Sequence, residues 1–294
     1  MEITLTAPTP FSLPAVVNSH GWVQLAPFQN GGDGSFSYVA RLSNGRVLHY
    51  SVSPIDGGVC VRVVGQLSAE EQGELAQQVR WTVGLDQDLS GFYELVRDHP
   101  KLSHVVVHAR GRLLRSPTLF EDVVKTILTT NTSWSGTIRM TRNLVDQFGD
   151  PLVSRPLPGD NAHRAFPTPS RLSESDEATL RKETSLGYRA PYVLQLARAV
   201  AGGELDLEAL KDPQLPTEAL RSHLLAIKGV GNYAAANLLL ILGRTDYIPI
   251  DSWALRVVSN EWHGGEPITP AQVEAAFADW GPWKGLAYVF WDWS

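Results

Sequence analysis

The sequence predicts an α+β protein: an N-terminal antiparallel β-sheet domain followed by a mostly α-helical domain that contains a helix-hairpin-helix motif. Three observations support this class. Short β-rich runs alternate with glycine-rich turns over residues 1–66. From residue 68 the pattern becomes helical almost to the C-terminus. Residues 224–258 then indicate a helix, a tight glycine hairpin, a second helix, and one carboxylate, Asp251, that opens a further helix.

The β-rich region contains five expected strands. Turn sequences rich in Gly, Asn and Asp at residues 30–34, 43–45 and 56–58 separate the later runs. Connections this short favour antiparallel pairing. A short helical turn is expected at residues 14–18. The expected strands are residues 2–6, 21–26, 36–42, 46–53 and 58–64.

The helical region begins with a capping box at Ser68 and Glu71, which opens a helix to about residue 81. Ser116 is expected to be the N-cap of the next helix, with Pro117 at its first position. The proline-rich residues 151–169 predict an exposed loop. The remaining expected helices are residues 118–130, 133–148, 170–172, 177–184, 190–201, 217–226, 251–262, 270–280 and 283–291.

We expect two domains: residues 1–80, comprising the sheet and its following helix, and residues 81–294, with the hairpin at about residues 224–236. The net charge of −6 disfavours a protein that coats nucleic acid, although a local patch and backbone amides could still bind it.

Cys60 is the single cysteine, which excludes a disulfide framework and four-cysteine metal sites.

Several other classes are disfavoured by the sequence. We expect no membrane-spanning helix, because no run reaches about 18 apolar residues, and no secretory signal, because MEITLTAPTP lacks a basic start and an apolar core. A reducing cytoplasm suits such a chain. The eight histidines lack metal-ligand spacing, and P-loop and Gly-x-Ser-x-Gly motifs are missing from the sequence.

The hairpin itself suggests an anion site. Gly229 and Gly231 permit positive φ and close approach of the backbone. Asn232 is expected to be the N-cap of an apolar core helix that Gly243 ends. Free backbone N–H groups from the hairpin and the helix start would converge on one point, where a phosphate fits.

The run LLAIKGVGNYAAANLLLILG, followed by PIDSWALRVV, resembles the signature of the helix-hairpin-helix-Gly/Pro-Asp superfamily of DNA glycosylases. Asp251 lies twenty residues after Gly231, as that signature requires. Other segments are similar to the 8-oxoguanine and 3-methyladenine II members of this superfamily: residues 112–121, 127–133, 186–192 and 281–283. The resemblance thus extends over essentially the full chain.

This resemblance implies a base-excision DNA glycosylase. Its partner would be double-stranded DNA that contains a damaged base, with no membrane involved and the protein a monomer. We expect it in the cytoplasm, associated with the nucleoid if the source is bacterial.

Asp251 is the expected catalytic residue. Breaking an N-glycosidic bond builds positive charge on the sugar, so a carboxylate near C1′ stabilises that charge and orients or deprotonates the attacking water. The N-terminus of a helix favours the ionised form. The alternative is that Asp251 is an ordinary N-cap.

The hairpin is the expected DNA-backbone site, and the alternative is a plain tight turn between helices. The residues expected to contact DNA are Lys228, Gly229, Val230, Gly231 and Asn232. The resemblance also implies an alkali cation, Na⁺ or K⁺, although no cofactor is required. The backbone carbonyls that would hold this cation belong to Leu225, Ile227 and Val230.

Tyr233 departs from the bifunctional members of the superfamily. Those members carry a lysine here that forms a Schiff base with C1′ and allows strand cleavage, which tyrosine cannot do. The alkylation-repair members have an aromatic residue that stacks on electron-poor bases. Tyr233 therefore predicts a monofunctional hydrolase; the alternative is an aromatic ring that only packs on the hairpin.

Two further sets of residues are expected to contact DNA. A side chain at one turn would enter the gap left by a flipped nucleotide or contact the orphaned base; the candidates are Asn131, Thr132 and Trp134. The base pocket is expected to be lined by Tyr233, Asn237, Ile241, Trp253, Tyr288 and Asp292. This pocket reproduces neither the 8-oxoguanine nor the 3-methyladenine II pattern, and each of its residues could instead be core or surface.

The sequence thus predicts a monofunctional glycosylase that excises a damaged, alkylated base. Two alternatives remain open: a bifunctional or oxidised-purine glycosylase with lyase activity, and a non-catalytic protein of the same fold that recognises DNA damage.

Overall fold

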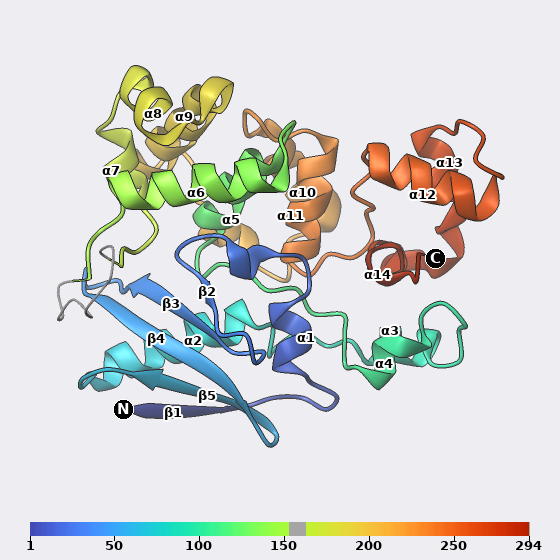
Figure 1. Cartoon of the computed structure of the whole chain (residues 1–294), viewed down its shortest axis with the longest axis horizontal. Coiled ribbons are helices and arrows are strands. Elements are labelled where there is room, and N and C mark those ends of the chain that lie inside the picture. The colour runs from blue at the N-terminus through green and yellow to red at the C-terminus, as the bar shows by residue number, and fades with distance from the viewer. Residues whose placement is uncertain (153–162, 294) are drawn as a thin grey trace. The chain divides into compact units, whose positions relative to one another are not determined.

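The N-terminal residues form a five-stranded antiparallel sheet in the computed structural model, which describes residues 1–152 and 163–293. The strand order is β1-β5-β4-β3-β2 (Figure 1). This confirms the predicted fold class. The strands are β1 (Glu2–Thr6), β2 (Gln29–Asn30), β3 (Phe36–Arg41), β4 (Val47–Ile55) and β5 (Gly58–Val63).

Aromatic side chains form the core face of this sheet. Tyr38 of β3 lies opposite Tyr50 of β4, and Tyr50 lies opposite Val63 of β5. The rings of Phe36 and Tyr38 both contact the fully buried ring of Tyr50. Alternation along each strand thus turns one face of the sheet toward the helices.

The prediction of a strand at residues 21–26 is wrong. Trp22–Gln24 form a 3₁₀ turn, η1, which follows helix α1 (Leu13–Val17). Gly21 enters this turn with φ of 89°. The indole N–H of buried Trp22 donates to Asp122 Oδ1 at 2.8 Å. This long-range bond ties the 3₁₀ turn to the helix that contains Asp122. The β-rich local sequence of residues 21–26 does not indicate such a contact.

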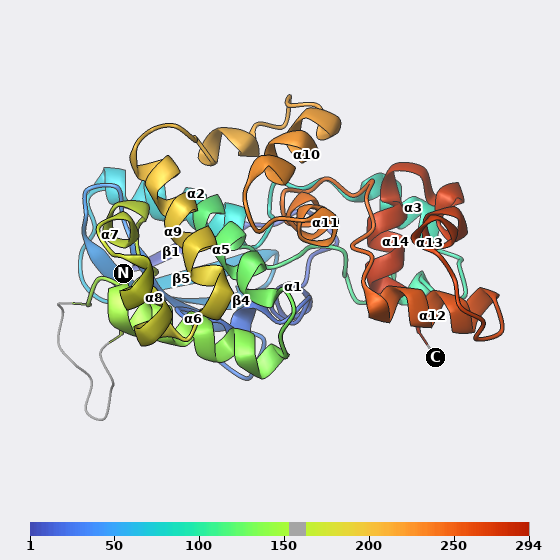
Figure 2. The same ribbon diagram turned by 90° about the horizontal axis from the view of Figure 1, so that it is seen from above.

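The chain forms two compact units, residues 1–86 with 112–209 and residues 87–111 with 210–294. The expected domains were residues 1–80 and 81–294. The compact units differ from them because the helices of residues 112–209 belong to the same unit as the sheet. In both views α5 lies between α6 and α2 (Figures 1 and 2). The helices of the first unit are α2 (Ala69–Thr82), α5 (Leu119–Thr129), α6 (Trp134–Phe148), α7 (Pro169–Ser173), α8 (Glu177–Thr184), η2 (Gly187–Arg189) and α9 (Ala190–Ala201).

Local capping signals were good guides to helix starts in this unit. The capping box of Ser68 and Glu71 opens α2, as predicted. For α5, however, the N-cap is Thr118 and not Ser116, because the Thr118 hydroxyl accepts the Glu121 N–H at 3.3 Å. Of the loop predicted at 151–169, residues 153–162 lie outside the described residues.

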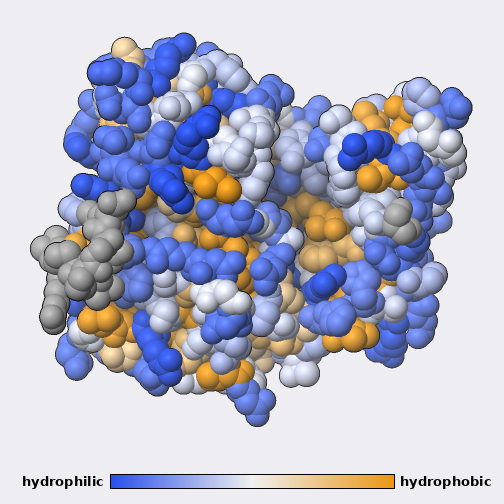
Figure 3. All heavy atoms as spheres, viewed as in Figure 1, coloured by the Kyte–Doolittle hydropathy of each residue, from blue (hydrophilic) through white to orange (hydrophobic). Residues whose placement is uncertain are grey.

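The second unit contains the hairpin. Helices α10 and α11 pack against each other, as do α12 and α13. On the face drawn in Figure 3, hydrophilic residues surround separate hydrophobic patches. Among the described residues, helices are too short or too polar to cross a bilayer. The elements are α3 (Ser90–Val96), α4 (Ser103–Val107), α10 (Thr217–Ala226), α11 (Asn232–Ile241), α12 (Ser252–Trp262), α13 (Pro270–Ala276), η4 (Ala278–Trp283) and α14 (Lys284–Phe290); η3 (Glu208–Lys211) spans the division between the units.

Candidate functional site

The turn between α10 and α11 is a tight hairpin with buried apolar ends. Gly229 adopts φ of 93°, which an L side chain rarely adopts. The Val230 N–H donates to the Ile227 carbonyl at 3.0 Å, and both side chains are buried. Gly231 has φ of −94° and so needs no glycine for its backbone angle. The expectation of positive φ is thus confirmed at Gly229 and wrong at Gly231.

Helix α11 begins one residue earlier than predicted. Gly231 is its N-cap, and Asn232 is its first residue, so the assignment of Asn232 as N-cap is wrong. The Asn232 side chain instead accepts a hydrogen bond from Arg221 of α10 at 2.9 Å. Within the described residues, the amides of Gly231, Asn232 and Tyr233 donate no hydrogen bond. Three N–H groups at a helix start are therefore available to an anion.

The carbonyls suggested as cation ligands retain lone pairs. Those of Leu225 and Val230 accept no backbone hydrogen bond from the described residues, and that of Ile227 accepts one, from Val230. Each carbonyl oxygen has two lone pairs, so the three oxygens fit the chemistry of an alkali cation. Among the described residues, clusters of His, Cys, Asp and Glu that could hold a metal are missing.

Asp251 is the N-cap of α12, as predicted. Its Oδ1 accepts the backbone N–H of Ala254 at 2.8 Å. Oδ2 accepts no hydrogen bond from the described residues, and the residue is half-buried. The carboxylate is therefore oriented through one oxygen, while the other stays available for a ligand.

Two tyrosines and a tryptophan lie in the neighbourhood of this carboxylate. Burial, and secondly the charge of Asp251, raises the pKa of Tyr233. Burial, followed by the charge of Asp251, also raises the pKa of Tyr288, and Tyr233 adds a smaller contribution in the same direction. The ring of Trp253 lies 6.1 Å from that of Tyr288 in an edge-on arrangement. The structure thus brings Tyr233, Tyr288 and Trp253 together around Asp251, with both phenols neutral at physiological pH.

The other residues expected in the base pocket are placed less favourably. Asn237 follows Tyr233 by one helical turn and donates to its carbonyl at 3.0 Å. Ile241 is buried on α11 as an ordinary core residue. The Asp292 side chain is exposed, and its backbone pairs with Lys101. The ring of Trp293 lies 5.8 Å from that of Trp253, so Trp293 and not Asp292 joins the aromatic cluster.

The turn proposed to enter the DNA lies in the first unit. Asn131 is exposed and adopts φ of 46°, a left-handed conformation that Asn tolerates. Arg189, buried beneath it, donates to the carbonyls of Thr130 and, at 3.2 Å, Asn131. The Tyr188 hydroxyl lies 3.4 Å from the Asn131 amide. The segment of residues 186–192 resembled the family, but these contacts were not foreseen.

The other two candidates at this turn are engaged elsewhere. A Cβ at Gly136 would lie 2.4 Å from Thr132 Oγ1, so the Thr132 side chain folds against its own helix start. The Trp134 indole N–H donates to Gln24 Oε1 at 3.0 Å. The Asn131 side chain, by contrast, is exposed and, within the described residues, has a single long contact, at 3.4 Å to the Tyr188 hydroxyl.

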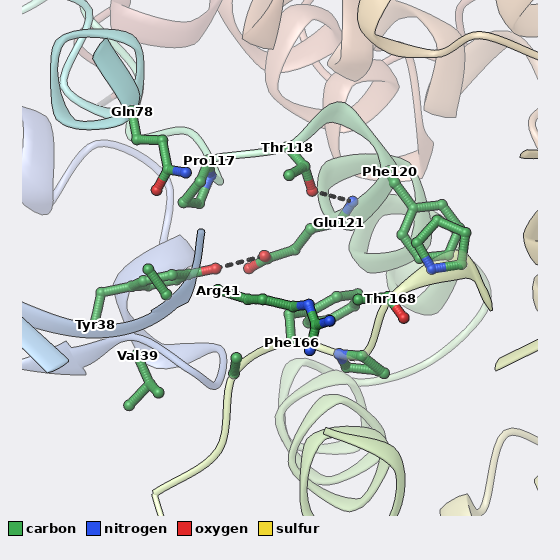
Figure 4. Close-up of a pocket in the computed structure, with 14 residues that line it drawn as sticks. Tyr38, Val39, Arg41, Gln78, Pro117, Thr118, Phe120, Glu121, Phe166 and Thr168 are labelled. Atoms are coloured by element: carbon green, nitrogen blue, oxygen red, sulfur yellow. Dashed lines mark hydrogen bonds between the residues drawn. The ribbon is translucent and has the colours of Figure 1, made fainter. Parts of the chain in front are cut away.

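A separate cavity of about 110 Å³ lies in the first unit, between β3, the start of α5 and residues 165–169 (Figure 4). In its wall the Tyr38 hydroxyl points toward Glu121 and donates to it at 2.6 Å (Figure 4). Glu121 is also paired with the fully buried Lys125. The lining residues include none of the predicted site residues, and these bonds join the sheet to α5.

The chain is similar in sequence to DNA repair proteins. Residues 124–282 match the family model described as HhH-GPD superfamily base excision DNA repair protein. The chain is 28% identical over 233 residues to the probable N-glycosylase/DNA lyase of Methanothermobacter thermautotrophicus, covering 71% of each protein. It is 23% identical to the DNA-3-methyladenine glycosylase of Bacillus subtilis, covering 74% of this chain and 71% of that protein.

Solved structures extend the similarity to nearly the whole chain. The structure of MBOgg1 in complex with a low-affinity DNA ligand has a TM-score of 0.76 and 25% identity, covering 98% of this chain and 94% of that one. The 3-methyladenine DNA-glycosylase from Archaeoglobus fulgidus has a TM-score of 0.75 at 20% identity, covering 99% and 97%, which shows a shared fold. Because the family model matches more than half of the sequence, this protein belongs to the HhH-GPD superfamily of base excision DNA repair proteins and is a DNA glycosylase of that family.

Proposed function

We propose that this protein is a monofunctional glycosylase that flips an alkylated base out of double-stranded DNA and hydrolyses its N-glycosidic bond. The product would be an abasic site in an unbroken strand. The observation that carries this proposal is that a phenol, Tyr233, and not an amine, occupies the position after the hairpin and lies close enough to Asp251 for the carboxylate charge to raise its pKa.

Asp251 would stabilise the positive charge that develops on the sugar and hold the attacking water. One of its oxygens is anchored to the α12 start, so the other is presented in a defined direction. A fixed charge in a partly desolvated site stabilises a transition state more strongly than the same charge in water. The neighbouring phenols add no negative charge to the site, since burial raises their pKa further above physiological pH.

DNA binding would rest on local features, since the net charge is −6. The amides of Gly231, Asn232 and Tyr233 would hold a phosphate, and a Na⁺ or K⁺ ion on the carbonyls of Leu225, Ile227 and Val230 would strengthen this contact. Lys228 would add a further backbone contact. We propose that Asn131 fills the gap left by the flipped base, which offsets part of its unstacking.

The aromatic residues suit an electron-poor base. Tyr233 is half-buried and Trp253 is 41% exposed, so both rings could contact a base, while buried Tyr288 packs edge-on against Trp253. Such aromatic rings attract cations and cationic bases. An alkylated purine carries positive charge and leaves as a neutral base, so it needs no strong acid. The relatives named 3-methyladenine glycosylases support this substrate class.

A bifunctional glycosylase with lyase activity is the second candidate. It is favoured by the relative with 28% identity, which is named a probable N-glycosylase/DNA lyase. This function needs an amine that reaches C1′, and Tyr233 does not supply one. A non-catalytic recognition protein is disfavoured because Asp251 is present and its carboxylate is oriented by the hydrogen bond from the Ala254 N–H.

A lesion panel tests the proposed function. Duplexes that contain one alkylated, oxidised or deaminated base are incubated with the wild type, and free base and strand breaks are measured separately. We expect free base from alkylated substrates and strand breaks only after alkali treatment. The matched variant Asp251→Asn should release base at least about 100-fold more slowly. Failure of the wild type to release any base would contradict the enzyme assignment.

A further inference from the structure

The wedge turn, residues 130–133, is held from two sides by side chains of the first unit. At its N-terminal end, Arg189 binds the carbonyls of Thr130 and Asn131. At its C-terminal end, Ser133 caps α6 by accepting the Gly136 N–H at 3.2 Å. The next residue, Trp134, is the first of α6, so whatever holds its side chain also holds the end of the turn.

Trp134 is held by the N-terminal region. Its indole N–H donates to Gln24 Oε1 at 3.0 Å, across 110 positions of sequence. Its ring packs so closely on Gly21 that a Cβ there would lie 2.8 Å from Cζ2. Gly21 and Gln24 belong to the η1 turn, which is itself anchored by the bond from Trp22 to Asp122. Trp134 is still 37% exposed, so the contacts with Gly21 and Gln24 fix the ring without burying it.

We propose that Gln24 and Trp134 are positioning residues for base opening. They fix the start of α6 and thereby keep Asn131 at the tip of a turn that is formed before DNA binds. The inference rests on the proposed function of Asn131. It gives the N-terminal region a part in base opening, beyond its structural role as a sheet.

The inference distinguishes two DNA contexts. In a matched duplex the damaged base must leave its stack and its partner, so a well-placed wedge accelerates the reaction. A lesion in a single-nucleotide bulge is already unpaired and needs the wedge less. Loss of the Gln24–Trp134 bond should therefore slow excision from the matched duplex selectively, whereas general destabilisation would slow both equally.

The test compares four variants on these two substrates in single-turnover assays. Gln24→Leu removes the acceptor, Trp134→Phe removes the donor but keeps a ring over Gly21, and the double variant combines them. We expect the matched-duplex rate to fall about threefold to tenfold, as for the loss of one neutral hydrogen bond, and the bulge rate to change less than twofold. The double variant should resemble the single variants, because both remove the same bond.

Gln29→Leu is the matched control. Gln29 is an exposed glutamine of the same region whose amide contacts His163 and not α6. It should leave the ratio of the two rates unchanged. Equal losses on both substrates, or an effect of Trp134→Phe without one of Gln24→Leu, would overturn the inference; the latter result would mean that Trp134 touches DNA itself.

A second measurement does not depend on catalysis. 2-Aminopurine placed opposite a stable abasic-site analogue reports, by its fluorescence, how far the wedge disturbs the orphaned base. We expect the wild type to raise this fluorescence and Gln24→Leu to raise it less. A wild type that excises no lesion would contradict the proposed function alone, whereas equal fluorescence in the two proteins would contradict this inference.

Discussion

Oδ1 of Asp251 accepts a hydrogen bond from the backbone N–H of Ala254 at 2.8 Å, while Oδ2 accepts none from the described residues. The structural role and the proposed catalytic role of Asp251 are therefore compatible. One oxygen caps α12, and the other can face the sugar. This division of labour makes the two roles separable by mutation.

Asp251→Asn should retain stability and lose activity. Asparagine is as good an N-cap as aspartate. The free energy of unfolding of Asp251→Asn should therefore stay within about 0.5 kcal/mol of the wild-type value. Asp251→Ala loses the cap and should lower that free energy by about 1 kcal/mol. Urea unfolding of both variants, with base-release assays, checks this. An unstable Asp251→Asn variant would show that its inactivity reflects unfolding.

The two hairpin glycines should separate folding from DNA binding. Gly229→Ala forces a side chain into φ of 93° and should cost about 1–2 kcal/mol of stability. Gly231→Ala meets no atom within 4 Å and has an ordinary φ of −94°. Loss of the glycine N-cap of α11 should cost only about 0.5 kcal/mol, but the added Cβ should obstruct a phosphate at the free amides and weaken DNA binding.

Thermal melts and titrations of duplex DNA at several salt concentrations measure both effects. Backbone amides carry no net charge and displace no counterion, so Gly231→Ala should lower the affinity for DNA at every salt concentration and leave the slope of log K against log salt unchanged. Unchanged affinity of Gly231→Ala for DNA would contradict the phosphate site at this hairpin.

His20 and Asp122 should affect stability in opposite directions as pH falls. Burial lowers the pKa of His20 from 6.5 to about 4, so the unfolded chain binds a proton first and stability falls between pH 6.5 and 4. Burial raises the pKa of Asp122 from 3.8 to about 6, so the folded state binds a proton first and stability rises over nearly the same range. Each contribution is about 3 kcal/mol, and in the wild type they largely cancel.

Substitution of either residue should reveal the other. As pH falls from 6.5 to 4, His20→Gln should become more stable relative to the wild type, because the contribution of Asp122 remains. Asp122→Asn should become less stable over the same range, because the contribution of His20 remains. Urea unfolding at pH 4.5 and 7 measures these slopes. Identical pH slopes in the two variants would refute the opposing titrations.

Local signals explain which parts of the fold could be predicted from the sequence. The capping box of Ser68 and Glu71, and the Asp251 cap, involve residues a few positions apart, and both were found. The η1 turn, by contrast, depends on Asp122, a buried acid of α5 that accepts the Trp22 indole N–H across 100 positions of sequence. Such tertiary contacts leave no periodic pattern in the sequence.

The candidate site shows the same limit. Spacing identified Asp251, and the resemblance identified Tyr233, which the structure places beside it. The contacts of Trp134 with Gln24 and of Arg189 with Asn131 join residues 110 and 58 positions apart. The sequence therefore suggested Trp134 as a wedge, whereas the structure shows its indole bound to Gln24.

The central claim is that Tyr233 makes this protein a hydrolase without lyase chemistry. Borohydride reduces a Schiff base to a stable protein–DNA adduct, so trapping on a lesion duplex tests the claim directly. Tyr233→Lys, which places an amine beside Asp251, is the positive control and should give an adduct. We predict that the wild type releases base with no adduct; a trapped adduct of the wild type would contradict the account.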